Sequence, residues 1–285
     1  MGVTKNIKDF FSGELKKSRG YGSEIAWISV PGGEFIMGSP ENESNRKEDE
    51  TTHPVTILPF RISKNAITVY QYKHFVESTG YITDSEKGLD GDSGCYVWNG
   101  YSSKFKQGVN WKYDERGRPL DSKKLNHPVI HISWNDAYAY AEWKGCRLPT
   151  EAEWEYACRA NTKSPFNTGN NLNINSANYK PNNAYVRRSD IAFNNEILTV
   201  GKLRPNAWGL YDVHGNVWEW CNDYYAPYPN VPQIDPKGPE TGKFRVARGG
   251  SWLSQSENCR SARRAYYQQN ETMYDIGFRV AMSEK

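Results

Sequence analysis

The strongest constraint on the fold of this sequence comes from three short helix starts that share one capping signal. In each, a threonine or serine is followed three residues later by a side chain that can bond back to the helix start. The pairs are Thr68 with Gln71, Ser133 with Asp136, and Thr150 with Glu153. Glycines end the first two helices, at Gly80 and Gly145. These signals predict short helices separated by long stretches without helical periodicity.

The remaining sequence favours short strands and long loops. From about residue 209 to 282, short apolar segments alternate with turn residues, which is typical of strands. Residues 83–126 and 161–197 are too irregular to be regular secondary structure throughout, and we expect them to form ordered loops. With 24 Gly, 15 Pro and 14% aromatic residues, the composition suits a loop-rich fold better than a helical bundle. We therefore expect an α+β fold with a small antiparallel sheet, helices and long ordered loops.

Chain organisation and charge narrow the class further. Residues 1–23 are mixed and charged, and we interpret them as an N-terminal tail or peripheral helix; residues 24–285 show neither a linker nor a repeat, which favours a single domain. A net charge of only +3 makes nucleic acid a poor partner. No apolar run reaches the ~18 residues of a membrane span, and the five cysteines include no CxxC pair.

Six motifs, in order, resemble one family. They are VPGGEFIMGS at 30–39, HPVIHISWNDAYAYAEW at 127–143, RLPTEAEWEYACRA at 147–160, GLYDVHGNVWEW at 209–220, RGGSW at 248–252 and GFRV at 277–280. Together they resemble the formylglycine-generating enzymes and their sulfatase-modifying-factor relatives. The resemblance implies a C-type-lectin-like fold of the formylglycine-generating-enzyme type for the single domain. Fold resemblance alone does not give function, because function depends on the site.

The resemblance also locates an oxidase site that this sequence lacks in part. In the family's oxidases, a first cysteine lies two residues after the aromatic of RGGSW and a second lies five further on, and the pair holds Cu(I). Those positions are Ser254 and Cys259 here. A hydroxyl is a poor ligand for a soft ion, so we expect no copper, no required cofactor and no formylglycine formation. In the alternative reading, a diverged oxidoreductase of this type or an accessory subunit, Cys259 would be the catalytic residue.

A structural calcium ion is a second implication of the resemblance. Relatives bind calcium at the GLYDVHGNVWEW loop, and the corresponding oxygen ligands here would be Asp212, Gly215, Val217 and Glu219. The alternative is that Asp212 and Glu219 make turn and backbone hydrogen bonds without an ion.

The stretch between RGGSW and GFR resembles the mutable segment in variable proteins of diversity-generating retroelements. It is rich in Ser, Asn, Gln, Arg and Tyr, as recognition surfaces are. We predict a ligand-binding surface at about residues 252–276, formed by Trp252, Leu253, Ser254, Ser256, Asn258, Tyr266, Tyr267, Asn270, Tyr274 and Asp275. The function predicted is non-catalytic binding of a protein or other macromolecule, at the cell surface or after export by analogy with the family, and otherwise in the cytoplasm. The alternative is that these are ordinary solvated loop residues.

Overall fold

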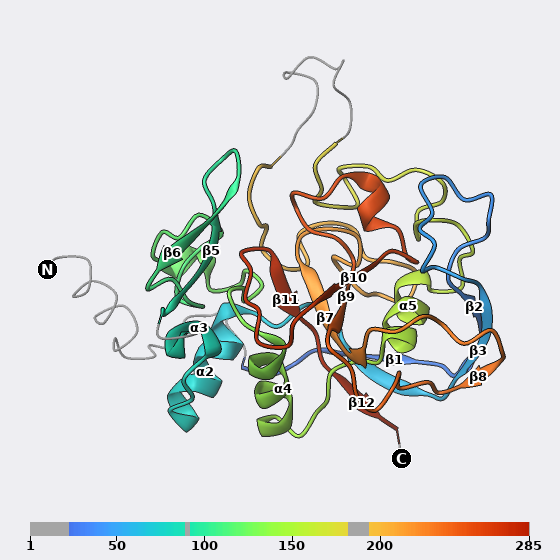
Figure 1. The fold of residues 1–285 in the computed structure, drawn as a ribbon, viewed down its shortest axis with the longest axis horizontal. Helices are drawn as coiled ribbons and strands as arrows, with labels where there is room; N and C mark the ends of the chain where they lie inside the picture. Colours follow the sequence, from blue (N-terminus) through green and yellow to red (C-terminus); the bar gives the residue numbers. More distant parts are fainter. Residues whose placement is uncertain (1–22, 89–91, 182–193, 285) are drawn as a thin grey trace, which may run out of the picture.

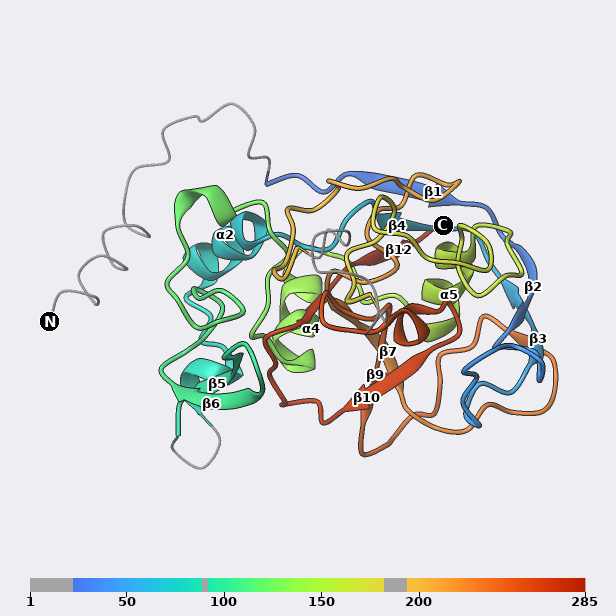
Figure 2. The ribbon, with the colours of Figure 1, turned by 90° about the horizontal axis from the view of Figure 1, so that it is seen from above.

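A mixed four-stranded sheet in the order β10-β9-β7-β11 lies at the centre of the fold. Its strands are Trp218–Tyr224 (β7), Arg245–Arg248 (β9), Arg264–Tyr267 (β10) and Ile276–Phe278 (β11). The computed structural model describes residues 23–88, 92–181 and 194–284, and in it this sheet separates two groups of elements (Figures 1 and 2).

The first group contains most of the helices. Its elements are Val69–Thr79 (α2), Asp84–Lys87 (α3), Gly94–Trp98 (β5), Ser103–Gln107 (β6), Ser122–Lys124 (η1) and Trp134–Trp143 (α4). Strands β5 and β6 form an antiparallel hairpin. Aromatic rings join α2 and α4 to the central sheet: the Tyr72 ring stacks at 5.9 Å from the Tyr140 ring, and Phe278 of β11 packs edge-on against both.

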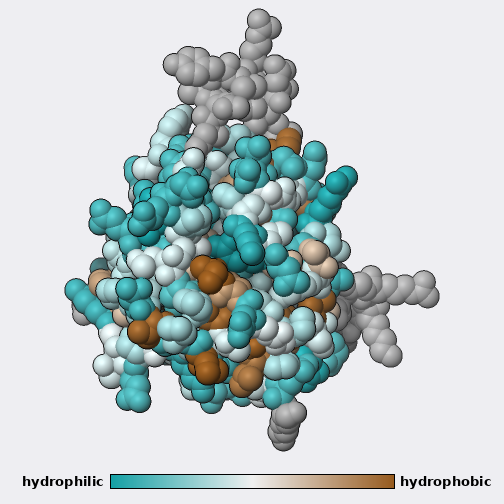
Figure 3. Space-filling view, turned by 90° about the vertical axis from the view of Figure 1, so that its right-hand side faces the viewer, coloured by the Kyte–Doolittle hydropathy of each residue, from teal (hydrophilic) through white to brown (hydrophobic). Residues whose placement is uncertain are grey.

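The second group surrounds α5, Glu151–Arg159, all of whose residues are buried. Around it lie the sheet Gly33–Met37 (β2), His53–Ile57 (β3) and Gln233–Ile234 (β8), and the sheet Trp27–Val30 (β1), Phe60–Ser63 (β4) and Ala281–Ser283 (β12). The outer face of this group carries apolar side chains scattered among polar ones (Figure 3). Ile36 and Ile234 are the most exposed of them in β2 and β8, and such separated apolar groups are normal on a surface.

All three predicted capping boxes are present in the structure. The Thr68, Ser133 and Thr150 side chains each accept the predicted backbone N–H, and Gln71, Asp136 and Glu153 accept in return. α2 ends at Gly80 in a left-handed conformation, as predicted. A further box, Thr83 with Glu86, begins α3 and was missed.

The α+β class is confirmed, but the strand arrangement differs from the predicted small antiparallel sheet. The described residues form four small sheets, and two pairings, β11 with β7 and β3 with β8, are parallel. Parallel pairing requires a long connection, and residues 225–275 supply one between β7 and β11. The predicted tail at residues 1–23 lies outside the described residues except for Ser23. No helix of the described chain is both long and apolar enough to cross a membrane.

Candidate functional site

Residues 249–275 join β9 to β11 and carry the whole predicted ligand surface. The segment leaves the sheet at Gly249 and Gly250, whose positive φ values of 99° and 77° suit glycine. Trp252 then enters the core, and the 3-10 turn Ser256–Cys259 (η2) follows. β10 runs back antiparallel to β9, so the segment is tied to the central sheet at both ends.

The two positions of the oxidase cysteines have structural roles here. Ser254 Oγ accepts a hydrogen bond of 2.9 Å from the Ser251 backbone N–H. Cys259 has no exposed area and packs in an apolar cluster. A Cβ atom on Gly250 would lie 2.5 Å from Cys259 Sγ, so the thiol is covered by backbone. Burial raises the pKa of the Cys259 thiol well above its usual value, which favours the protonated form.

All five cysteines are free thiols, and none offers Cys259 a disulfide partner. The ring of His214 lies next to the Cys259 backbone. Its Nδ1–H donates to Cys259 O at 2.7 Å, and Nε2 accepts from the Asn167 N–H at 3.0 Å. Burial lowers the pKa of His214 to about 4, so the ring is neutral and both nitrogens are used. The described residues contain no group of three or more His, Cys, Asp and Glu side chains placed to hold a metal.

The structure divides the predicted surface residues into two sets. Those at least partly accessible are Leu253, Ser254, Ser256, Asn258, Tyr266, Tyr267 and Asn270. Trp252, Tyr274 and Asp275 are buried, at 0%, 8% and 8% exposure, which corrects the prediction that they form part of the surface. Asp275 Oδ2 accepts a hydrogen bond of 2.8 Å from Ser251 Oγ, and this buried contact joins the two ends of the segment.

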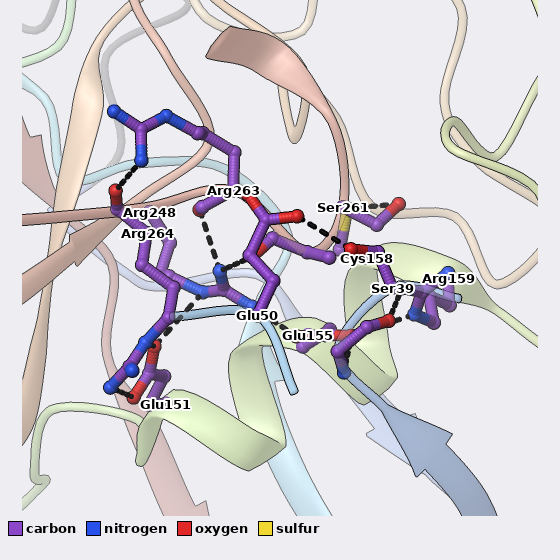
Figure 4. Close-up of polar contacts among 12 residues, drawn as sticks. Ser39, Glu50, Glu151, Glu155, Cys158, Arg159, Arg248, Ser261, Arg263 and Arg264 are labelled. Carbon is purple, nitrogen blue, oxygen red and sulfur yellow. Dashed lines mark hydrogen bonds and ion pairs between the residues drawn. The ribbon is translucent and has the colours of Figure 1, made fainter. Parts of the chain in front are cut away.

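Buried arginines hold this segment against α5 and the loop before β3 (Figure 4). Arg264 donates to both oxygens of Glu151 at 2.7 and 2.9 Å. Arg260 donates to both oxygens of Glu50 at 2.7 Å. Both arginines are 2% exposed. Such bidentate, desolvated pairs fix geometry, so the accessible residues sit on a rigid support.

Arg248 connects the same support to the central sheet. It forms an ion pair with Glu155, and Arg159 Nε donates to that carboxylate at 2.9 Å. Arg248 Nη1 also donates to the backbone oxygens of Ala262 and Arg263, directly before β10. Glu155 and Arg159 are four residues apart in α5, but no local pattern links Arg248 to its partners, so the sequence did not reveal them.

A groove lies between the accessible part of β10 and the loop before β3. We call it the Tyr266 groove; it is lined by Arg46, Lys47, Glu48, Asp49, Tyr225, Arg263, Arg264, Ala265, Tyr266 and Tyr267. The Tyr266 ring stands 4.1 Å from the Tyr225 ring and is 46% exposed. Arg263 Nε donates to Asn258 Oδ1 at 3.1 Å, which links the groove to η2. The groove therefore offers aromatic faces, hydrogen-bonding groups and both signs of charge.

The residues assigned to calcium bring two buried carboxylates into one region. Asp212 Oδ2 accepts one hydrogen bond of 2.8 Å, from the Gly201 N–H. Glu219 is paired through both oxygens with Arg279, and it also accepts from Trp154 Nε1. Burial, assisted by the Glu219 charge, raises the pKa of Asp212 to about 6, although the Gly201 N–H and Arg279 act in the opposite direction. Arg279 therefore balances the charge of Glu219, and Asp212 has no ion-pair partner among the described residues.

A family model for the sulfatase-modifying factor enzyme 1-like domain matches residues 13–284. The chain belongs to this family. A formylglycine-generating enzyme of Streptomyces coelicolor is 36% identical over 281 residues, covering 89% of this chain and 88% of that protein. A Mus musculus relative named inactive C-alpha-formylglycine-generating enzyme 2 is 29% identical, covering 93% of this chain and 88% of that protein.

Solved structures of similar fold place this family member among C-type-lectin-like proteins. PvdO from Pseudomonas aeruginosa matches with a TM-score of 0.69 and 26% identity, covering 93% of this chain and 96% of that one. Treponema denticola variable protein 1 matches with a TM-score of 0.66 and 21% identity, covering 94% and 98%, and this likeness concerns the fold alone. The predicted family and fold are thus confirmed.

Proposed function

We propose that this chain is a non-catalytic ligand-binding protein whose accessible C-terminal residues recognise a protein or other macromolecule. The observation that carries the proposal is the state of the oxidase positions. Ser254 supplies a hydroxyl to a turn, and Cys259 is buried and protonated. A serine hydroxyl cannot replace a thiolate as a Cu(I) ligand, so the two-sulfur site that the oxidase chemistry of the family requires lacks one of its two ligands.

The accessible residues have the chemistry of a recognition surface. Tyr266 and Tyr267 present amphipathic rings beside the Tyr266 groove, and Ser256 and Asn258 present short polar groups on η2. Tyrosine supplies contact area at low entropic cost, and small polar residues adapt to different partners. The buried ion pairs of Arg260 and Arg264 hold the backbone of this surface in place when its accessible side chains are substituted.

This support suits diversification of the retroelement type. The likeness to Treponema denticola variable protein 1 is compatible with it but extends to the fold only. Sequencing the gene from several isolates tests the idea. We expect substitutions concentrated at accessible positions within residues 253–270, with Arg260, Arg264 and Cys259 unchanged. Uniform drift along the chain would contradict the proposal. We place the protein at the cell surface, where a diversified receptor would meet its ligands.

Formylglycine formation is the second candidate, favoured by the identity to the Streptomyces coelicolor enzyme. The test is incubation of the full chain with copper and a cysteine-containing sulfatase peptide. We expect no aldehyde product from the wild type or from Cys259→Ser. A product that appears with the wild type and disappears with Cys259→Ser would establish the enzymatic function and defeat the binding proposal.

A further inference from the structure

A second cavity, of about 330 Å³, opens beside the N-terminus of α5, and Arg264 lines both this cavity and the Tyr266 groove. Its buried polar groups are His53, Glu151, Asp223 and Arg264, and its walls include Tyr228. It shares no accessible residue with the predicted C-terminal surface, so an inference about it does not depend on the proposed function.

The two carboxyl groups of this cavity differ in how they are satisfied. Glu151 accepts from Arg264 Nε and Nη2 at 2.7 and 2.9 Å and from the Tyr228 hydroxyl at 2.9 Å, so its charge is balanced. Asp223 is 4% exposed, and its Oδ2 accepts only the Glu151 backbone N–H, at 2.9 Å. Its Oδ1 has no hydrogen-bond or ion-pair partner among the residues that the structure describes.

The neighbouring charged groups do not balance the charge of the Asp223 carboxylate. Burial, together with the nearby charges of Glu151 and Glu153, raises the pKa of Asp223 to about 8, although the Glu151 N–H and Arg264 act in the opposite direction. Lys237 and His53 also line the cavity, and neither forms an ion pair with Asp223 among the described residues. A buried carboxyl without a counter-charge is costly when ionised, and a bound cation would remove that cost.

The wall chemistry indicates which kind of cation fits. Four of the lining residues are prolines: Pro227, Pro229, Pro236 and Pro239. Proline has no N–H, so its backbone offers carbonyl acceptors and its ring offers apolar surface. A ligand with several N–H donors and a hydrocarbon body complements such walls, whereas a hydrated metal ion would leave the apolar surface unused.

We propose that this cavity binds an alkylammonium group, with its nitrogen at Asp223 Oδ1 and its alkyl chain against the proline rings and Tyr228. A small free amine and a lysine side chain of a partner protein carry the same chemistry. The Asp223 carboxylate would bind the ammonium, so the bound amine and the proton of Asp223 compete for one site.

The experiment measures binding of n-butylammonium to the full chain by calorimetry at pH 6.5 and 8.5. Ionisation of Asp223 rises through pH 8 while the ammonium stays charged, so we expect roughly 20-fold tighter binding at pH 8.5. The ¹³C resonance of the Asp223 carboxyl should also titrate at lower pH when the amine is present. Nα-acetyl-lysine methylamide distinguishes the sources: its binding points to a lysine side chain, and binding of butylammonium alone points to a free amine.

Matched variants decide whether Asp223 is responsible. In Asp223→Asn the amide oxygen can still accept the Glu151 N–H, so α5 keeps its start; we expect at least about a 10-fold loss of affinity. Glu240→Gln removes an exposed negative charge from the neighbouring loop and should leave affinity unchanged. Absence of saturable binding at pH 8.5, equal affinity in Asp223→Asn, or equal affinity for neutral 1-butanol would each overturn the proposal.

Discussion

Arg260 shows at the level of one residue how the C-terminal segment is held. Its guanidinium is 2% exposed and contacts two carboxylates, Glu50 and Glu43, on a loop more than 200 positions earlier in the sequence. In the sequence, Arg260 lies in a polar stretch that is typical of solvent-exposed loops. Its partners come within reach only in the folded protein. Nothing in the local sequence indicates that this arginine is buried.

Replacing Arg260 by methionine should lower the free energy of unfolding by about 3–5 kcal/mol, since Glu50 would remain buried without its partner. Urea denaturation measures the change. Adding Glu50→Gln to that variant should restore part of the loss, and Arg46→Met on the same loop should cost under about 1 kcal/mol. A loss below about 1 kcal/mol for Arg260→Met would show that the pair does not support the segment.

Asp223 should make stability depend on pH. Its folded-state pKa of about 8 lies above the ~3.9 of an unfolded aspartate, so folding favours the protonated form. Its contribution is fully present below about pH 4 and is lost as the pH rises to 8. Between pH 5 and 8, the stability of the wild type relative to Asp223→Asn should fall by on the order of 3 kcal/mol. Parallel profiles from urea unfolding would contradict this.

At the level of elements, the sequence predicted the helices better than the strands. Capping boxes are local, so Thr68, Ser133 and Thr150 could be identified directly. By contrast, β1 and β2, which are joined by Pro31 and Gly32, pair with β4 and β3 and not with each other. Strands of two to seven residues carry too little pattern to choose a distant partner.

Thr150→Ala should destabilise the protein by about 1 kcal/mol, because the Glu153 N–H at the start of α5 would lose its acceptor. Thr150→Ser keeps the hydroxyl and should change stability by no more than a few tenths of a kcal/mol. Urea unfolding of the two variants side by side gives the comparison; equal losses would mean that the methyl group, and not the cap, is responsible.

The GLYDVHGNVWEW loop should bind calcium, as we propose from the unbalanced Asp212. At one hundred times its Kd, calcium should raise the midpoint of thermal unfolding by roughly 5 °C, because only the folded loop gathers the ligands. Asp212→Asn should abolish the shift, whereas Glu284→Gln should preserve it. An unchanged midpoint at millimolar calcium would leave Asp212 and Glu219 as purely structural residues.

For the molecule as a whole, the accessible surface and its buried support are separate sets of residues. The predicted surface at this segment included Trp252, Tyr274 and Asp275. These three are buried because the segment folds back onto the core between β9 and β11, which residue type alone does not reveal.

This separation predicts that the protein tolerates substitution of the accessible surface residues without unfolding. Combined substitution of Ser256, Asn258, Tyr266 and Asn270 by alanine should shift the free energy of unfolding by less than about 2 kcal/mol, the sum of ordinary surface effects. Arg264→Ala alone should cost more, because Glu151 would lose its bidentate partner. Thermal and urea unfolding provide the test; a collapse of the fourfold variant would mean that the surface is part of the support.

Strands β10, β11 and β12 complete two sheets whose other members come from residues 27–63 and 218–248. During synthesis the edges of these sheets stay unpaired until residues 264–283 have emerged from the ribosome. If the segment varies as we propose, folding itself selects among the variants: a copy whose altered residues obstruct β10 or β11 leaves the four-stranded sheet unfinished and exposed to proteases.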